Sequence, residues 1–367
     1  MSNNDFLYEL AFSYFPGIGP IKFDALLKHF GTAKLAYEAS AGDLREAMGA
    51  NLSCKFLGYR NNFDFDSEYK KITDNNITLL MREDLRYPSA LLNLSDPPIC
   101  LYVKGDLTNF HWNDESASEL YFAVVGTRNP TEYGRQITTK FSRELSETGT
   151  IIVSGMAMGV DALAHWAALR AGGKTIAFLG CGVNIIYPWA NTNLYHKIIE
   201  SGGLVISEFP PDMVTLKGHF VARNRLISGL SKGVLVAEGL KDSGSLITAR
   251  YALAQGKDVF APPAPITSDQ SQAPNILLKD GAKLVTTVED ILEEYDVKKK
   301  QTLKETLKEI PENQKQLFQL LSAEAFTPDE IARSLNVPVY QVLSLLSTME
   351  LSKIIEKNIS GKYQIKI

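Results

Sequence analysis

Residues 151–170 read IIVSGMAMGVDALAHWAALR, and this stretch decides the fold of the chain. It begins with an apolar run, passes through a glycine-rich turn, and continues with apolar residues at helical spacing. A short run that is apolar throughout is typical of a strand covered on both faces, so the stretch predicts one strand–turn–helix unit. Because similar units recur between residues 121 and 261, we expect a Rossmann-like, doubly wound parallel sheet of the α/β class.

The predicted sheet belongs to a middle domain, residues 79–296. Its predicted strands are Tyr121–Val125, Ile151–Val153, Thr175–Leu179, Leu204–Ser207, Val234–Ala237, Asp258–Ala261 and, at the edge, Lys283–Val285. Its predicted helices are 133–147, 160–171, 192–201, 221–230 and 244–255. Each helix lies between two strands, as the crossover connections of a parallel sheet require.

Residues 1–78 predict a separate helical domain. The segment Phe15-Pro16-Gly17-Ile18-Gly19-Pro20 precedes an amphipathic helix that ends at Gly31, and a second helix follows over Ala33–Tyr37. This order is typical of a helix-hairpin-helix or SAM-like unit. The backbone N–H groups of Gly17-Ile18-Gly19 suit a phosphate, yet the domain carries ten acidic against eight basic residues. That balance favours an interaction or structural role.

A winged-helix domain is predicted for residues 314–367, after a polar linker at 297–313. Its second helix opens with a capping box, Thr327-Pro328-Asp329-Glu330, and a hairpin follows the third helix. The third helix, Pro338–Met349, contains Gln341 but none of Arg, Lys or Asn, the other side chains that read base edges. We therefore expect protein contact, or weak and non-specific DNA contact. The basic side chains for the latter are Lys353, Lys357 and Lys362.

The composition is that of a soluble globular protein. The 367 residues are 45% hydrophobic and 22% charged, which excludes a disordered chain, a collagen and a coiled-coil rod. No apolar run approaches the roughly 20 residues that span a bilayer, and no secretory signal opens the chain, so we expect no membrane contact and a cytoplasmic location. The three cysteines have no CxxC spacing and predict neither a disulfide framework nor a metal site.

Glycines, hydroxyl residues and one arginine follow the predicted strands, where open α/β sheets bind their ligands. These segments are Gly126-Thr127-Arg128, Ser154-Gly155-Met156-Ala157, Gly180-Cys181-Gly182, Ser207-Glu208, and Glu238-Gly239 leading to Ser243-Gly244-Ser245. Glycine lets a ligand approach the backbone, and helix N-termini favour anions. One such glycine is ordinary turn chemistry, but the five segments together predict a phosphate site. The first turn lacks the G-x-G-x-x-G spacing of a dinucleotide site.

A long acid-free segment runs from Met213 to Ala237 and carries several basic residues. Within it, Arg223-Asn224-Arg225 stands at the start of a predicted helix, where the helix dipole disfavours cations. Either these arginines bind an anionic ligand, or they pair with carboxylates such as Glu208. Because the net charge of the chain is −4, a polyanion site must be a local pocket.

Six motifs occur in the order seen in DNA-processing protein A, the DprA/Smf family, which the chain resembles. They are Val125-Gly126-Thr127-Arg128, Ser154-Gly155-Met156-Ala157-Met158-Gly159-Val160-Asp161, Tyr187-Pro188, Ser207-Glu208-Phe209-Pro210, Arg223-Asn224-Arg225-Leu226-Ile227-Ser228-Gly229-Leu230-Ser231 and Ser243-Gly244-Ser245-Leu246-Ile247-Thr248-Ala249. The resemblance covers about 80–290 closely and the flanking domains more loosely. The chain departs from the family pattern at Asn184, where the family has an aspartate.

This resemblance implies a bacterial protein that binds single-stranded DNA without sequence specificity. It also implies protection of incoming DNA in natural transformation, loading of the recombinase RecA, and a homodimer formed through the Rossmann-like domain. No catalytic residue, metal or cofactor is implied. The DNA-binding residues carried over by motif are Gly126, Thr127, Arg128, Ser154, Gly155, Arg223, Asn224 and Arg225, with Leu226 as an apolar contact to a base.

The alternative is a nucleotide-binding or nucleotide-hydrolysing enzyme that resembles the phosphoribohydrolases. In their pattern P-G-G-x-G-T-x-x-E, the carboxylate position corresponds to Thr248 here, which removes the acid–base group. Glu208 and Glu238 remain as carboxylates. His165 is either a general base or, as we favour, a packed helix residue. Asp161 either orients a group of the rim or interacts favourably with the helix dipole.

Overall fold

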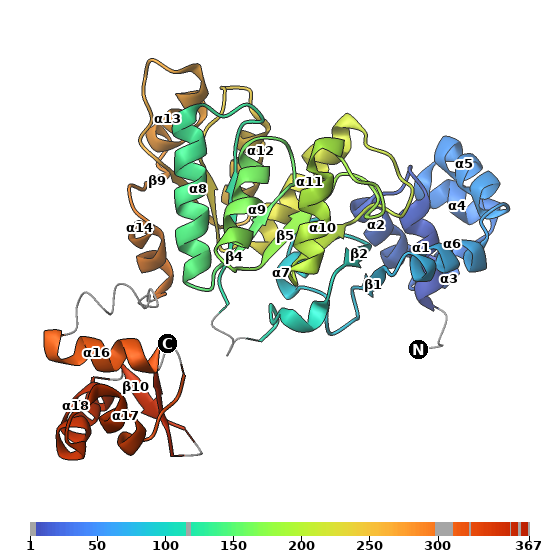
Figure 1. Ribbon diagram of the computed structural model, residues 1–367. Helices are drawn as coiled ribbons and strands as arrows, with labels where there is room; N and C mark the ends of the chain where they lie inside the picture. The colour runs from blue at the N-terminus through green and yellow to red at the C-terminus, as the bar shows by residue number, and fades with distance from the viewer. Residues whose placement is uncertain are drawn as a thin grey trace. The chain divides into compact units, whose positions relative to one another are not determined.

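The computed structural model describes residues 5–114, 119–297, 311–322, 324–352, 354–358 and 361–365. The chain forms two compact units, Met1–Asp296 and Val297–Ile367 (Figure 1). The sequence-based boundary between residues 78 and 79 falls inside the first unit, and the four-part division of the chain stays a prediction. Within the described residues, none of the helices combines the length and the apolar character needed to cross a bilayer.

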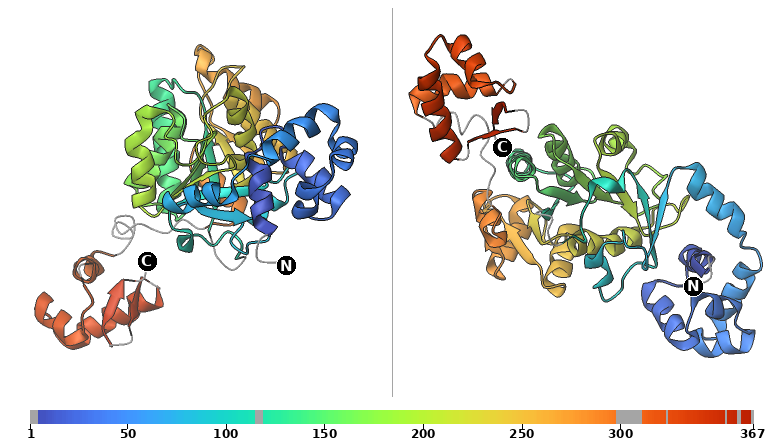
Figure 2. Two further views of the ribbon diagram at one scale, coloured as in Figure 1. Left: turned by 90° about the vertical axis from the view of Figure 1, so that its right-hand side faces the viewer. Right: turned by 90° about the horizontal axis from the view of Figure 1, so that it is seen from below.

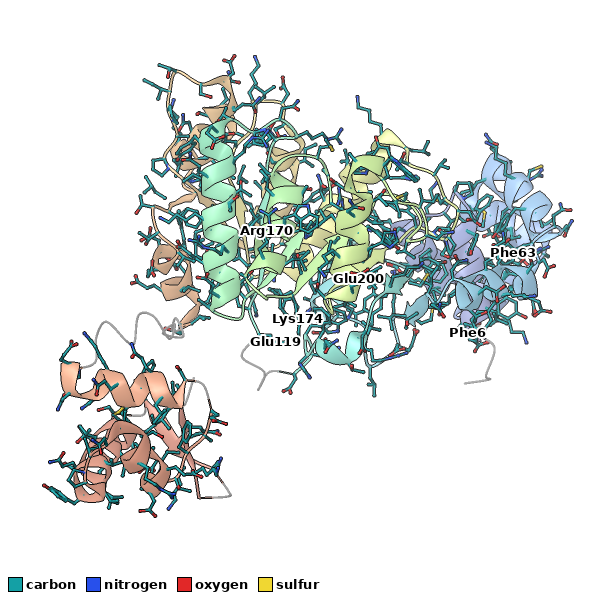
Figure 3. All side chains as sticks on the ribbon, in the orientation of Figure 1. Phe6, Phe63, Glu119, Arg170, Lys174 and Glu200 are labelled. Carbon is teal, nitrogen blue, oxygen red and sulfur yellow. The ribbon has the colours of Figure 1, made fainter. Side chains whose placement is uncertain are left out.

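The first unit opens with six helices around an aromatic core. They are α1 (Asp5–Tyr14), α2 (Pro20–Phe30), α3 (Ala33–Glu38), α4 (Ala41–Met48), α5 (Ala50–Arg60) and α6 (Phe65–Asp74). Phe12 of α1 stacks on Phe56 of α5 at 5.1 Å between ring centroids. Figure 3 labels Phe6 and Phe63 among the side chains of this part. Gly31, with φ +90°, ends α2 as predicted, and Pro20 is the first residue of this helix.

A nine-stranded sheet follows, in the order β1-β2-β6-β5-β4-β3-β7-β8-β9. The strands are β1 (Thr78–Met81), β2 (Cys100–Lys104), β3 (Tyr121–Val125), β4 (Ile151–Ser154), β5 (Thr175–Phe178), β6 (Leu204–Ser207), β7 (Gly233–Val236), β8 (Asp258–Ala261) and β9 (Lys283–Leu284). From β6 to β9 all neighbours are parallel, which confirms the predicted doubly wound sheet. β1 and β2 were not predicted from the sequence; they pair antiparallel with each other, and β2 pairs antiparallel with β6, which adds an edge to the sheet.

Helices cover both faces of this sheet (Figure 2). One face carries α8 (Glu132–Glu147), α9 (Val160–Arg170) and α10 (Thr192–Glu200). The other carries α7 (Ser89–Leu92), α11 (Lys217–Leu230), α12 (Gly244–Ala254) and α13 (Gln272–Lys279), whose apolar residues share one core. Short elements complete the unit: η1 (Leu107–Asn109), η2 (Trp189–Asn191), η3 (Asp269–Ser271), α14 (Glu289–Leu292) and η4 (Glu293–Tyr295).

The topological switch point lies between β3 and β7. The chain runs outward through β4, β5 and β6 on one side of β3 and then returns to place β7 on its other side. Ligands of such sheets bind where the strand order reverses. The predicted start of the helix after β6 was wrong: α11 begins at Lys217, about one turn earlier. Arg223-Asn224-Arg225 therefore lies inside the helix, and the helix-dipole argument does not apply to it.

The described residues of the second unit form three helices and a hairpin, as predicted. They are α16 (Glu312–Leu321), α17 (Pro328–Leu335), α18 (Val339–Leu351), β10 (Ile355–Lys357) and β11 (Tyr363–Ile365). The predicted capping box is present, because Glu330 N–H donates to the Thr327 hydroxyl and Thr327 N–H donates to the Glu330 carboxylate. On α18, Tyr340 is exposed while Val342 and Leu346 are buried. Lys353 lies outside the described residues.

Candidate functional site

A groove of about 780 Å³ lies at the switch point, beyond the carboxyl ends of β3 and β7. One part of its lining follows β3, another comes from the first half of α11, and a third is the segment at the start of α12. The residues that matter below are Gly126, Thr127, Arg128, Lys217, Phe220, Arg223, Asn224, Ser243, Gly244 and Ser245. The tertiary structure thus brings together three of the segments that the sequence analysis selected separately.

The floor of the groove is a tight junction of two strand ends. Thr127 N–H donates to the backbone oxygen of Glu238 at 2.8 Å. A Cβ atom on Gly126 would lie 2.8 Å from the same oxygen, so packing alone demands glycine at this position. The glycine that suggested a ligand is therefore also a requirement of the fold.

Arg128 is an exposed cation that lines the groove. Its guanidinium carbon lies 5.6 Å from the ring centroid of Phe220, within the range of a cation–π interaction. Within the described part of the chain, Arg128 makes no ion pair with a carboxylate. Phe220 in turn lies 5.5 Å from the ring of Tyr187. Both rings border a small pocket of about 60 Å³ that adjoins the groove and shares Arg128 with it.

Arg223 lines the same groove and small pocket as Arg128 and is only 4% exposed. Its Nη1 donates to the backbone oxygen of Phe178, and its Nε has no hydrogen-bond partner among the described residues. Burial lowers the pKa of Arg223 to about 10, while the Asp161 carboxylate acts in the opposite direction. The side chain therefore remains a cation at neutral pH, held under the groove rather than on an open rim.

Asp161 organises the turn after β4. Its carboxylate accepts hydrogen bonds from the N–H groups of Gly155 at 3.2 Å and Ala157 at 3.4 Å. Burial raises the pKa of Asp161, and the charge of Arg223 opposes that rise. Of the two interpretations of Asp161, these contacts favour the one that orients the rim. Ser154 is fully buried and donates to the backbone oxygen of Val124 at 2.7 Å, so its hydroxyl serves the fold.

Two polar residues of α11 complete the groove. Asn224 lines it and donates from its side chain to the backbone oxygen of Gly244 at 3.3 Å, which joins α11 to the start of α12. Lys217 is exposed at the first turn of α11 and also lines the groove. Lys217 was absent from the predicted site, although it belongs to the acid-free segment that signalled the site.

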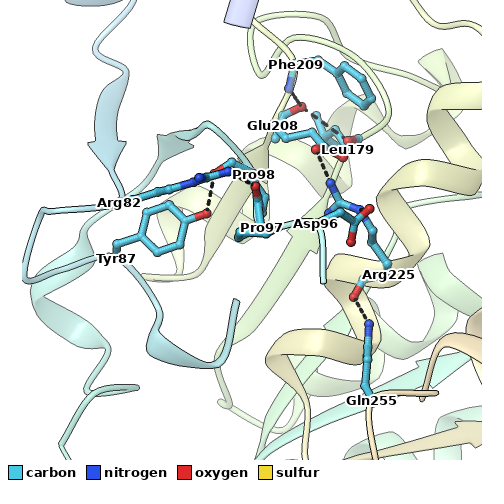
Figure 4. A network of polar contacts seen from close by, with 11 residues as sticks. Arg82, Tyr87, Asp96, Pro97, Pro98, Leu179, Glu208, Phe209, Arg225 and Gln255 are labelled. Carbon is cyan, nitrogen blue, oxygen red and sulfur yellow. Dashed lines mark hydrogen bonds and ion pairs between the residues drawn. The ribbon is translucent and has the colours of Figure 1, made fainter. Parts of the chain in front are cut away.

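Arg225 and Leu226 do not line the groove, so two of the DNA contacts predicted by motif lie apart from the others. Arg225 is 3% exposed and pairs with Glu208 at 2.6 Å and Asp96 at 2.8 Å (Figure 4). This is the carboxylate alternative that the sequence had left open. Leu226 is fully buried in the core on that face of the sheet. Successive residues of a helix point about 100° apart, so neighbours in the motif reach different sides.

The carboxylates considered for catalysis have structural partners. Glu238 accepts hydrogen bonds from the N–H group of Thr131 at 2.9 Å and from its hydroxyl at 2.5 Å, at the start of α8. Glu208 is engaged by Arg225. His165 is fully buried and lies 2.6 Å from the Thr175 hydroxyl. Among the described residues, no group of His, Cys, Asp and Glu is arranged to hold a metal ion.

Comparison with known proteins places these features in one family. The family model described as DNA recombination-mediator protein A matches residues 78–296, and the DprA winged helix domain matches residues 301–357. Protein Smf from Synechocystis is 37% identical over 299 residues, which cover 80% of this chain and 73% of that protein.

Two solved structures are similar to the chain. DNA processing protein A from Streptococcus pneumoniae has a TM-score of 0.66 and 35% identity, covering 80% of this chain and 98% of that one. DNA processing protein A from Helicobacter pylori has a TM-score of 0.51 and 34% identity, covering 60% and 95%. The Helicobacter pylori structure gives insight into the single-stranded DNA binding mode of that protein.

Proposed function

We propose that this chain, which belongs to the DNA recombination-mediator protein A family, binds single-stranded DNA in the groove between β3 and β7. The observation that carries the proposal is the position of two exposed cations, Arg128 and Lys217, in one groove with the ring of Phe220. Non-specific binding of a single strand combines a cationic track for the phosphates with an aromatic surface for the bases. The similarity to the Helicobacter pylori protein supports the same substrate.

The proposed contacts are divided by accessibility. Arg128 and Lys217 are exposed and hold phosphates by charge-assisted hydrogen bonds. Arg223 supplies positive charge from its buried position in the groove wall, and Asn224 offers polar contacts in the same groove. Gly126 and Thr127 line the groove, and Gly155 lines the small pocket beside it. Ser154, Arg225 and Leu226 are left out of the proposed interface because their side chains are buried in other contacts.

A direct binding comparison tests this function. Fluorescence anisotropy with a labelled single strand, and with a duplex of equal length, is measured on the full chain over a range of salt. We expect a clear preference for the single strand and little dependence on sequence, because the contacts are to phosphates and to ring faces. Equal or tighter binding to the duplex would refute the proposal.

We further propose that the bound strand is protected and passed to the recombinase RecA in natural transformation, as the family resemblance implies, and that the chain acts without catalysis. The test is RecA filament formation on a single strand already coated with a single-strand-binding protein. Addition of this chain is expected to accelerate filament formation, and Arg128→Ala is expected to remove the effect. Acceleration that survives loss of DNA binding would point to a different mode of action.

A homodimer formed through the Rossmann-like domain belongs to the same proposal. The edge strand β9 has β8 as its neighbour in the sheet, and its Leu284 is 56% exposed. Exposed Leu253 of α12 and Ile276 of α13 border an adjoining hollow of about 210 Å³. An unpaired edge with apolar neighbours favours association with a second copy. Light scattering should report a dimer for the chain and a monomer for Leu253→Glu; a Leu253→Glu variant that stays dimeric would exclude this surface.

A further inference from the structure

We propose that Arg225 is a positioning residue for the DNA groove. It holds α11 in one rotational setting, so that Arg223 and Asn224 face the groove while Arg225 itself never touches DNA. The proposal rests on the proposed single-stranded DNA binding. It assigns a role to a motif residue that the groove does not use: Arg225 borders another cavity, of about 890 Å³, which shares no lining residue with the groove.

The guanidinium of Arg225 joins two distant parts of the chain. Its Nε pairs with Asp96, which precedes β2, and its Nη2 pairs with Glu208, which follows β6. The Arg225 side chain is 4% exposed and that of Glu208 is 8% exposed. The planar guanidinium presents its donors in a fixed fork, so two carboxylates at fixed places define its orientation. The backbone of α11 therefore has little freedom to rotate at this residue.

Stability alone does not account for such a cluster. Buried ion pairs often contribute no more to folding than well-packed apolar residues of similar volume, because both charges lose their hydration. Their best-attested use is to select one geometry among several. The geometry selected here is that of α11, since Arg223 lies two residues before Arg225 and about 200° around the helix. With Arg225 fixed on one side, Arg223 is directed to Phe178 and the groove floor.

The cluster is anchored on both flanks. Gln255, just after α12, donates to the backbone oxygen of Arg225 at 3.0 Å. The segment after Asp96 is held by Arg82, whose Nε donates to the backbone oxygen of Pro98 at 2.9 Å and which also contacts Pro97 (Figure 4). Arg82 also forms an ion pair with Asp24 of α2. The segment that carries Asp96, one of the two carboxylates that orient Arg225, is thus itself held in place by Arg82 and α2.

The test uses the full chain with Arg225→Lys, which keeps the charge and loses the fork. Single-strand affinity is measured by anisotropy at several salt concentrations, and folding is followed by circular dichroism at the same temperature. We expect affinity to fall about tenfold with the salt slope unchanged, because the number of phosphate contacts is the same and their geometry is poorer. Asp96→Asn removes the ion pair between Asp96 and Arg225 while keeping nearly the same side-chain shape. It should weaken binding less, and the double variant should be non-additive.

The control is Arg143→Lys on α8, the same substitution at a half-exposed arginine that pairs with Glu144 and lines neither cavity. It should leave affinity and slope unchanged. Arg225→Met removes the charge, and a salt slope that falls by about 0.7 in that variant would mean a direct phosphate contact and overturn the proposal. Unchanged affinity in a folded Arg225→Lys or, should that variant unfold, in Asp96→Asn would also overturn it. Failure of the unmodified chain to bind single strands would instead refute the proposed function.

Discussion

The guanidinium of Arg223 lies against Gly155 so closely that a Cβ atom at residue 155 would overlap it. Gly155 follows β4, Arg223 comes from α11, and the turn and the arginine share Asp161 as a partner. Gly155, which suggests a ligand site in the sequence, leaves the space that the buried Arg223 guanidinium fills in the fold. This relationship links the backbone of one motif to the charge of another.

Gly155→Ala is therefore expected to weaken single-strand binding by displacing Arg223. The backbone at Gly155 does not adopt a positive φ, so the methyl group acts through the overlap with Arg223 and not through backbone strain. Anisotropy gives the affinity, and thermal melting gives the stability. Gly58→Ala in α5, where an added Cβ meets nothing within 4 Å, is the control and should leave binding unchanged. Wild-type affinity in Gly155→Ala would show that the position of Arg223 is irrelevant to DNA.

Arg128→Ala should reduce affinity for every single-stranded sequence alike. An exposed arginine that neutralises one phosphate contributes about 0.7 to the slope of log K against log salt, so the slope should flatten by that amount. The melting temperature should barely move, because an exposed side chain contributes little to folding. A sharp fall in melting temperature with an unchanged slope would remove Arg128 from the interface.

Arg223→Ala should behave differently, because Arg223 is buried. Its removal leaves the Asp161 carboxylate buried without the positive charge that opposes the rise of its pKa. Losing this charge, together with the hydrogen bond from Arg223 to the backbone oxygen of Phe178, costs about 1–3 kcal/mol of stability. We expect a clearly lower melting temperature together with weaker binding. Urea unfolding gives the free energy, and an unchanged midpoint would contradict this assignment.

No turnover of nucleoside monophosphates is expected. Glu238 is held by Thr131 at the start of α8, and Glu208 is held by Arg225, so neither carboxylate is placed as an acid–base group. Incubation with AMP or CMP, followed by chromatography for released base, tests this. Release above background that Glu238→Ala or Glu208→Ala abolishes would establish an enzyme.

His165 should make stability depend on pH. Burial, and then the nearby charge of Arg223, lower the pKa of His165 to about 3. Since this value lies below that of an unfolded histidine, near 6.5, the unfolded state binds the extra proton between these limits. The contribution of neutral His165 to the free energy of unfolding is complete above pH 6.5. It is lost as pH falls towards 3, by at most about 1.4 kcal/mol per pH unit.

Urea unfolding from pH 7 to pH 4 measures the effect of His165. His165→Asn should flatten the dependence relative to the wild type, whereas His29→Gln, at an exposed position of α2, should preserve it. Identical profiles for His165→Asn and the wild type would mean that folding does not change the pKa of His165, and would contradict the effect of burial.

Much of the architecture follows from short-range patterns. Seven strands and the helices between them were predicted because each unit is an apolar run, a turn and an amphipathic helix, all local in sequence. The strands β1 and β2 were not predicted because they are antiparallel. They therefore do not belong to the repeated strand–helix–strand units that were used to recognise the other strands. The start of α11 was misplaced because Lys217-Gly218-His219 carries no capping signal, and the helix begins there without a side-chain cap.

The sequence by itself determined the fold class, the six ordered motifs and the segments that meet at the switch point, because periodicity and turn chemistry are local properties. The tertiary structure alone decided which arginine faces which side. Arg223 and Arg225 are two residues apart in one basic motif, yet one lies under the groove and the other between Asp96 and Glu208. That division depends on the rotation of α11 against the sheet and on carboxylates more than 15 residues away in the sequence. Such long-range partners appear only when the chain is folded.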